Sequence, residues 1–254
     1  MQAQAQGSRV RTLLVIGGTA FLLILVARFP ATRLESLLER HFKDVSLQAV
    51  SGSVFSGQAA RFVYQGIDLG PVRWQFRPAA LLQGRLEYRL GLSSPDNLLR
   101  ARVGVTLSGK VYGRELVATL PSNRWINHFS PVAIHSSGDL ELMLETFEMN
   151  NDFPQGVAGR LAWEDAAILD PVNLVLGRVA LDIRSRDGAL LGTVTAPGEL
   201  GLAGTLELMP DGRYNVDVLL QPGGLIDGEA LELLDAVASI GPQGDYRIRY
   251  AGQL

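Results

Sequence analysis

The feature that most constrains this chain is a stretch of alternating apolar residues that occurs twice. Val50 to Phe76 combines turn residues with apolar residues at alternate positions, and Val157 to Ile183 repeats the pattern 107 residues later without a gap. Seven residues recur identically: Val50, Gly52, Ala59, Ala60, Leu69, Gly70 and Val72 return as Val157, Gly159, Ala166, Ala167, Leu176, Gly177 and Val179. Such a repeat is typical of one supersecondary unit used twice. The alternative is a chance likeness between two β-rich segments.

The same period of two runs through most of the chain after Leu47. Apolar residues alternate with charged or polar ones in at least six segments: 72–77, 85–92, 139–144, 178–183, 213–218 and 245–250. Strands with one apolar and one charged face are typical of antiparallel sheets, and glycine-rich breaks between the segments supply the turns. The sequence therefore predicts a mainly β fold built of antiparallel sheet with an internal duplication.

A few short helices are expected to accompany the sheet. Residues 30–46 begin with Pro30 and have leucines at helical spacing, which predicts a juxtamembrane amphipathic helix. Pro121 to Phe129 predicts a loop with a helical turn, and Leu225 to Ile240 predicts a helix closed by Gly241 and Pro242. We place the first β repeat at residues 47–149 and the second at 150–254.

The N-terminus carries a candidate membrane anchor. An uncharged, mostly apolar run lies between Arg11 and Arg28, and extending it to residues 12–29 gives about the length needed to cross a hydrocarbon core of roughly 30 Å, with both arginines reaching the headgroups. A cleaved signal peptide is the alternative. The small residues that a cleavage site requires are poorly placed, and this favours an uncleaved single transmembrane helix.

The orientation of the anchor depends on its flanks. Residues 1–11 carry Arg9 and Arg11 without an acidic residue, as expected of a cytoplasmic tail. Basic residues also follow the anchor, and taken alone they would argue for the reverse orientation. A short tail on one side and one large domain on the other favour an N-terminus in the cytoplasm and a C-terminal domain across the membrane.

Composition excludes several function classes. The formal net charge is −3 and there is no basic block, which argues against a nucleic-acid surface. The chain contains no cysteine, so it has no disulfide, thiolate nucleophile or Cys-ligated metal site. We expect no cofactor.

No catalytic constellation is evident. The three histidines His41, His128 and His135 lack the spacing of a helical metal motif, and neither a nucleophile elbow nor a phosphate-binding loop is present. Carboxylate pairs such as Glu164–Asp165 and Asp139–Glu141 are better explained as solvated charges on strand faces. The chain is therefore expected not to be an enzyme. That expectation would change if His128 or His135 lay in a cleft beside carboxylates.

Several blocks together resemble the type II secretion system protein N family of Gram-negative bacteria. They are V-S-G-S-V-F-S-G-Q-A at 50–59, L-G-P-V-R-W-Q-F-R-P at 69–78, G-R-L-A-W-E-D-A at 159–166, L-G-R-V at 176–179 and the C-terminal G-P-Q-G-D-Y-R-I-R-Y-A-G-Q-L. Phe55 stands where a tryptophan is expected in the first block. The residues expected to form the core of the repeats are Gly52, Leu69, Gly70, Val72, Trp74, Gly159, Trp163, Leu176, Gly177 and Val179.

The resemblance implies an accessory component of the secretion machine, anchored in the inner membrane with its domain in the periplasm. It also implies a distant similarity to AsmA-like proteins, which are associated with lipids. Two functions follow as hypotheses: a non-enzymatic scaffold that contacts other type II secretion system subunits, or a groove that takes a lipid ligand. The bilayer itself would be a partner through the N-terminal helix. A closed core favours the scaffold, and an open apolar trough favours lipid.

Overall fold

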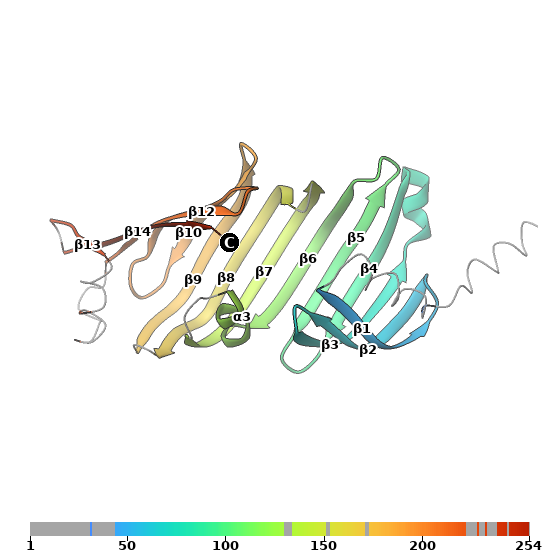
Figure 1. The fold of residues 1–254 in the computed structure, drawn as a ribbon, viewed down its shortest axis with the longest axis horizontal. Coiled ribbons are helices and arrows are strands. Elements are labelled where there is room, and N and C mark those ends of the chain that lie inside the picture. The colour runs from blue at the N-terminus through green and yellow to red at the C-terminus, as the bar shows by residue number, and fades with distance from the viewer. Residues whose placement is uncertain are drawn as a thin grey trace, which may run out of the picture. The chain divides into compact units, whose positions relative to one another are not determined.

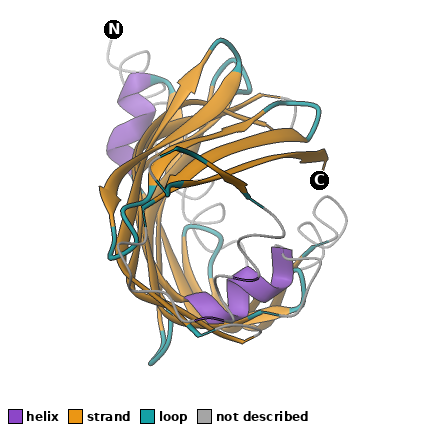
Figure 2. Ribbon diagram, turned by 90° about the vertical axis from the view of Figure 1, so that its left-hand side faces the viewer, coloured by secondary structure: helices purple, strands orange, loops and turns teal. Residues whose placement is uncertain are grey.

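The structure is a computed structural model of the 254-residue chain. It describes residues 31, 44–129, 134–150, 153–170, 173–221, 228, 232, 238–242 and 244–253. The chain divides into two compact units, Met1–Phe76 and Arg77–Leu254. Both are built mainly of antiparallel strands, and the two helices whose bounds the structure gives are short (Figures 1 and 2). The prediction of a mainly β, antiparallel fold is confirmed.

The first unit contains three antiparallel strands in sequence order. These are β1 (Val45–Gly52), β2 (Ser56–Tyr64) and β3 (Ile67–Phe76). β1 runs from Val45 opposite Tyr64 to Gly52 opposite Gly57. Non-glycine residues with positive φ occur in β1 at Ala49, with a φ of 53°, and at the β2–β3 turn at Gln65, with a φ of 49°. The pairing of β2 with β3 shifts register between Ala59 and Phe62. Such irregularities increase the local twist of a ribbon.

Trp74 is the centre of the first unit. Its side chain is 7 % exposed, and its indole N–H donates to the carbonyl oxygens of Ser53 and Val54, each at 3.1 Å. Gly57 lies directly under the ring, because a Cβ atom there would come within 2.4 Å of Trp74 Cζ2. The ring thus ties β3 to the turn between β1 and β2, and only glycine fits beneath it.

The second unit contains eleven strands in the described part of the chain. They are β4 (Arg85–Ser93), β5 (Leu98–Thr106), β6 (Val111–Pro121), β7 (His135–Asn150), β8 (Phe153–Asp170), β9 (Leu174–Arg186), β10 (Ala189–Pro197), β11 (Ala203–Leu208), β12 (Arg213–Leu220), β13 (Ser239–Ile240) and β14 (Tyr246–Gln253). Two short helices accompany them, η1 (Pro78–Gln83) before β4 and α3 (Ser122–Phe129) between β6 and β7. Each strand pairs with the next along the chain as far as β12, which pairs with β14 (Figure 1).

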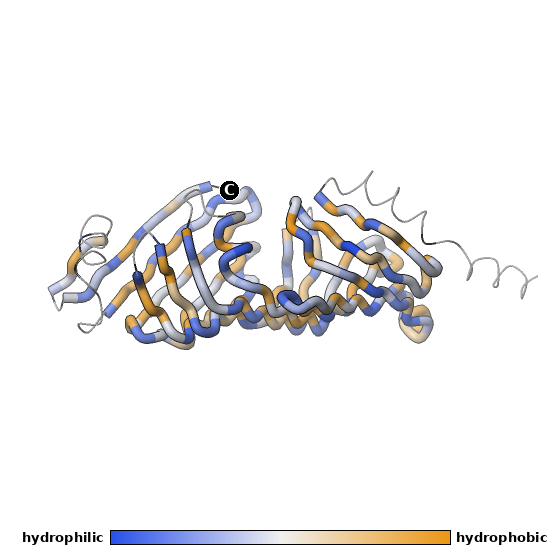
Figure 3. Tube along the Cα trace, turned by 90° about the horizontal axis from the view of Figure 1, so that it is seen from below, coloured by the Kyte–Doolittle hydropathy of each residue, from blue (hydrophilic) through white to orange (hydrophobic). Residues whose placement is uncertain are grey.

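Strand register divides this sheet into an apolar and a polar face. One unbroken apolar row crosses eight strands from β6 to β14: Leu116, Leu144, Gly159, Ile183, Gly192, Leu206, Val216 and Tyr250 are successive cross-strand partners. The next row belongs to the other face and runs Arg160, Asp182, Thr193, Thr205, Asp217 and Arg249. The alternation is visible along the strands in Figure 3. Period two is therefore realised as predicted.

The core of the second unit contains few large buried side chains. Its buried cluster consists of Ala166, Leu176, Leu200 and Leu220, with Trp163 and Val179 among the half-buried residues packed against it. Half of the twenty buried apolar residues of the described chain are alanines. On the apolar row the larger side chains stay accessible, and Leu206 and Tyr250 are 43 % and 59 % exposed. The described residues therefore leave much of the apolar face uncovered.

The helix predictions have different outcomes. Pro121 to Phe129 was expected to hold a helical turn, and α3 confirms this. The predicted helices at residues 30–46 and Leu225–Ile240 fall mostly outside the described residues, as does the whole of the predicted anchor at 12–29 with its flanks Arg11 and Arg28. Among the helices that the structure does describe, none has both the length and the apolar character needed to cross a bilayer.

The two copies of the repeat match in environment at several positions. Ala59 and Ala166 are each 1 % exposed, and Leu69 and Leu176 are 5 % and 7 % exposed. The two copies differ in secondary structure. In the first copy β1 ends at Gly52 and a turn leads to β2, whereas in the second copy Gly159 lies within the single strand β8. The division of the chain into repeats at residues 47–149 and 150–254 stays a prediction.

Candidate docking surface

The polar face of the second unit carries a ladder of charge pairs from β8 to β14. Arg160 and Asp182 lie 3.1 Å apart across β8 and β9, and Arg178 pairs with Glu164 at 2.6 Å. At the far end Asp217 of β12 accepts from two arginines of β14, Arg247 at 2.7 Å and Arg249 at 3.4 Å. All of these groups are exposed or half-exposed, so each pair contributes little to stability. Together they form a patterned charged surface on this face of the sheet.

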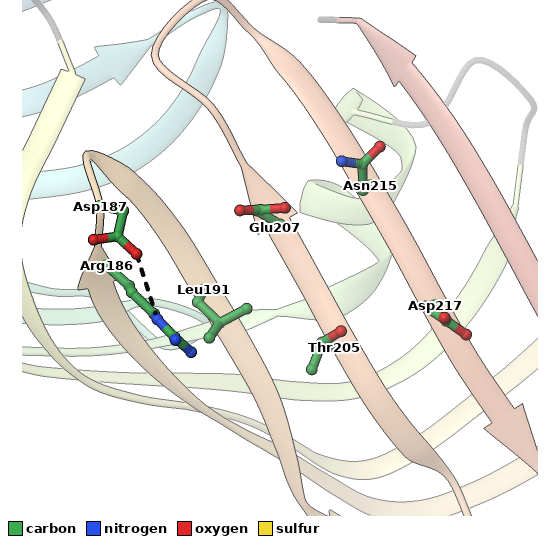
Figure 4. Close-up of a pocket in the computed structure, with 7 residues that line it drawn as sticks. All are labelled: Arg186, Asp187, Leu191, Thr205, Glu207, Asn215 and Asp217. Atoms are coloured by element: carbon green, nitrogen blue, oxygen red, sulfur yellow. Dashed lines mark ion pairs between the residues drawn. The ribbon is translucent and has the colours of Figure 1, made fainter.

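Two shallow hollows lie in the middle of this face. One, of about 420 Å³, is lined by Arg186, Asp187, Leu191, Thr205, Glu207, Asn215 and Asp217 (Figure 4). The second, of about 430 Å³, is lined by Asp182, Arg184, Ser185, Arg186, Leu191, Thr193 and Thr195. Leu191 is the apolar residue that both share, and it sits among polar groups from neighbouring strands. Both hollows are lined mainly by charged, hydroxyl and amide side chains.

Asp217 is the charged residue of the ladder that pairs with two arginines. The hydrogen bond from Arg247 lowers the pKa of the Asp217 carboxyl below its usual range, and the charge of Arg249 adds to the effect. Asp217 also raises the pKa of Arg247 in return. The cluster is therefore fully ionised at neutral pH and fixes the orientation of both β14 arginines.

Among the described residues, β14 has an open edge along most of its length. It pairs with β12 over eight residues without a bulge, from Arg213 opposite Gln253 to Leu220 opposite Tyr246. On its other side, β13 is its one partner among the described residues, opposite Arg247 and Tyr246. The Arg247 carbonyl accepts from the hydroxyl of Ser239 in β13, so Arg247 points its backbone groups to that side. By alternation, Arg249 and Ala251 point their N–H and C=O groups to the same edge.

A buried ion pair lies on the polar face of β4 to β6. Glu87 is 4 % exposed, and its carboxylate accepts from the guanidinium of Arg77 and, at 2.9 Å, from the hydroxyl of Tyr112. Burial alone would raise the pKa of Glu87, but the hydrogen bonds from Tyr112 and Arg77 outweigh it, so the pKa lies below its ordinary value. Sequence alternation assigned Glu87 to a charged outer face. That assignment was wrong, because the ring of Tyr112 and the side chain of Arg77 cover the carboxylate.

The residues singled out from sequence are spread over both units rather than gathered in one site, and most of them are buried or half-buried. Gly52 is exposed, so its predicted place in the core was wrong. In the first unit Leu69, Val72 and Trp74 are buried, and Gly52 and Gly70 have positive φ. In the second unit Trp163 donates its indole N–H to the Ser137 carbonyl at 2.9 Å beside Val179 and Leu176, Gly177 has a φ of 65° and Gly159 sits in mid-strand. His135 is exposed, and the described residues hold no cluster of metal-ligating side chains.

Comparison with known proteins decides the family. A model of the family described as type II secretion system (T2SS), protein N, matches residues 43–249. The chain belongs to the type II secretion system protein N family. It is 30 % identical over 220 residues to the type II secretion system protein N of Vibrio cholerae, covering 84 % of this chain and 86 % of that protein. It is 27 % identical over 240 residues to that of Aeromonas hydrophila, covering 92 % and 95 %.

The protein N of Klebsiella pneumoniae is a further relative, 27 % identical over 184 residues, or 70 % of this chain and 71 % of that protein. No solved structure matches the chain. The matches support a component of a protein secretion system and confirm that part of the sequence interpretation. The expected distant similarity to AsmA-like proteins finds no support in them.

Proposed function

We propose that this protein N is a non-enzymatic accessory component of the type II secretion system, anchored in the inner membrane by residues 12–29, with its β units in the periplasm. It works as a scaffold that contacts other subunits of the system. The open edge of β14 is the docking site, and an extended segment of a partner adds to it as a further strand. The observation that carries the proposal is the regular ladder of β14 with β12, which leaves an equally regular edge for a partner.

β14 is better suited to strand addition than β1. A partner strand needs a run of evenly spaced N–H and C=O groups, and β14 has no residue with positive φ between Tyr246 and Ala251. In β1 the positive φ of Ala49 interrupts the run, and natural proteins use such irregularities to protect an edge from unwanted pairing. The charged ladder beside β14 supplies specificity, since a partner strand would meet Arg249 held by Asp217.

Replacing Ala251 with proline tests this docking site. Proline removes an N–H that faces the open edge, and it leaves in place the ladder bonds of Tyr250 and Gly252 to β12. We expect the full-length variant to fold and to reach the membrane, but to lose most of its co-purification with secretion subunits in mild detergent. Secretion by a strain that carries it on the chromosome should fall with that loss.

The matched control is Ala251→Val, which keeps the N–H and adds a side chain favourable to strands. It should co-purify and secrete like the wild type, and circular dichroism should show both variants folded. If Ala251→Pro co-purified the subunits as well as the wild type does, strand addition at β14 would be ruled out. A scaffold that binds through the polar hollows would remain compatible with that result.

A lipid-binding groove is the second candidate function. The observation that favours it is the unbroken apolar row from β6 to β14 with its exposed Leu206 and Tyr250. Lipid analysis of the same detergent preparations separates the two functions. Phospholipid or lipopolysaccharide at a fixed ratio, with no secretion subunit in the preparation, would favour the groove.

A further inference from the structure

Two leucines of the second unit are almost fully exposed at neighbouring turns. Leu82 in η1 is 92 % exposed, and Leu107 in the turn between β5 and β6 is 90 % exposed. Burying a leucine side chain stabilises a protein by about 1.5–3 kcal/mol. Because these two side chains face water, they contribute none of this stabilisation to the fold on its own. Single exposed apolar residues are ordinary, but a contiguous group of them marks a contact surface.

These two turns are held together by the backbone. The N–H of Leu107 donates to the carbonyl of Gly84 at 3.2 Å. Gly84 ends η1 with a φ of 67°, and a Cβ atom there would lie 3.1 Å from Leu107 Cδ1. The two leucines therefore belong to one continuous projection at this end of the sheet.

Further exposed apolar residues extend the projection. Leu81 is 54 % exposed, and Leu86, Val105 and Val111 are successive cross-strand partners on one sheet face, each between 37 % and 44 % exposed. We call this set the leucine tip: Leu81, Leu82, Leu86, Val105, Leu107 and Val111. It contains no aromatic residue, whereas the anchor residues of protein–protein interfaces are enriched in tryptophan, tyrosine and arginine.

Positive charge surrounds the leucine tip. Residues 77–114 contain seven arginines or lysines and two acidic residues, in a chain whose net charge is −3, and one of the seven, Arg102, pairs with Glu115 at 2.7 Å. One of the two acidic residues is the buried Glu87, already paired with Arg77. Arg85 and Arg114 lie over the ring of Tyr112, at 5.5 and 5.4 Å from its centroid, and Lys110 is exposed in the same turn as Leu107. Their charges therefore remain available to an anionic surface.

We propose that the leucine tip inserts into the surface of an anionic bilayer. Aliphatic side chains on a protruding turn enter the boundary between headgroups and acyl chains, while flanking arginines and lysines bind the lipid phosphates. The basic charge around this aliphatic tip favours an anionic lipid surface over a protein pocket. The contact uses other residues than the docking edge of β14 and the proposed anchor at residues 12–29. It would fix the orientation of the second unit relative to the membrane surface.

The absence of cysteine from the chain makes a direct test simple. The full-length variants Leu107→Cys and Asp187→Cys are each labelled with an environment-sensitive fluorophore and reconstituted into vesicles of phosphatidylcholine, with or without phosphatidylglycerol. Asp187, in the turn between β9 and β10, is the matched control because its side chain is 91 % exposed. We expect the label at 107 to shift to the blue in anionic vesicles, to be quenched by lipid-borne quenchers and to be shielded from iodide.

The label at 187 should remain in water in both kinds of vesicle. Adding Leu82→Asp to the Leu107→Cys chain should abolish the shift, while thermal unfolding stays close to that of the parent. Equal iodide quenching at 107 and 187 in anionic vesicles would overturn the proposal. So would a shift that appears only when other secretion subunits are added, since the occupant would then be a protein. The Ala251→Pro substitution should leave the signal at 107 unchanged, which separates this contact from docking at β14.

Discussion

Replacing Trp74 with alanine is expected to lower the free energy of unfolding of the first unit by about 4 kcal/mol. The indole is the largest side chain in the interior of this unit and is 7 % exposed. Its removal opens a cavity above Gly57 and leaves the carbonyls of Ser53 and Val54 without the N–H that now binds them. Both effects destabilise, because the cavity loses packing and the carbonyls lose a buried donor.

Trp74→Phe separates these two contributions. Phenylalanine fills much of the cavity but cannot donate a hydrogen bond, so we expect a loss of about 1–2 kcal/mol. Unfolding by guanidinium chloride, followed by circular dichroism, measures both variants. Equal losses for the two would mean that the hydrogen bonds dominate, and a loss below about 1 kcal/mol for Trp74→Ala would contradict the central role of the ring.

Much of the sheet could be predicted from sequence because one periodic signal governs it. Val72 and Trp74 alternate with Arg73 and Gln75, and the structure buries the first pair and exposes the second. The backbone geometry of a strand sends successive side chains to opposite faces. This alternation therefore holds even where few residues cover the sheet. Trp74 was assigned to core packing from its place in this alternation, and that interpretation is confirmed.

The alternation could not predict where the register between neighbouring strands shifts. Asp165 and Glu115 adopt positive φ, and the pairing of β8 with β9 shifts register between Trp163 and Ala166. A positive φ is rare for glutamate, and aspartate is only a weak signal for it, so the local sequence does not predict these irregularities. The same limit applies to the candidate docking surface. Asp217 lies 30 residues before Arg247 in the sequence, and only the pairing of β12 with β14 brings it to Arg247 and Arg249.

Sequence patterning also failed where a charged residue is buried by its neighbours. Glu87 alternates with Leu86 and Tyr88 as an outward residue should, yet Leu86 is 43 % exposed and Glu87 is 4 % exposed. The reversal comes from Tyr112 on β6, whose hydroxyl reaches the carboxylate across β5, and from Arg77 before η1. Because a buried carboxylate is costly unless it is paired, the arginine and the tyrosine that surround Glu87 form a single unit with it.

Replacing Glu87 with glutamine should therefore destabilise the second unit by about 2 kcal/mol. Breaking a buried pair by removing one partner costs roughly 3–5 kcal/mol, but the side chain of Arg77 is 34 % exposed and water can solvate part of its charge. For a chain of this size the midpoint of thermal unfolding should fall by about 4–8 °C. The matched control is Glu115→Gln. Glu115 pairs with Arg102 at 2.7 Å but is 59 % exposed, so its loss should cost about 0.5 kcal/mol or less.

The dependence of this loss on pH identifies its origin. Folding lowers the pKa of Glu87, so the carboxylate stabilises the folded chain fully above the ordinary value of 4.5 and loses that effect as the pH falls through the folded pKa. The difference in unfolding free energy between wild type and Glu87→Gln should thus be constant from neutral pH down to about pH 4.5 and shrink below it. A difference that stayed constant into stronger acid would show that glutamine disturbs packing rather than charge. The interior of β4 to β6 would then be held together by the shape of the Tyr112 ring and its neighbours, and not by the ion pair.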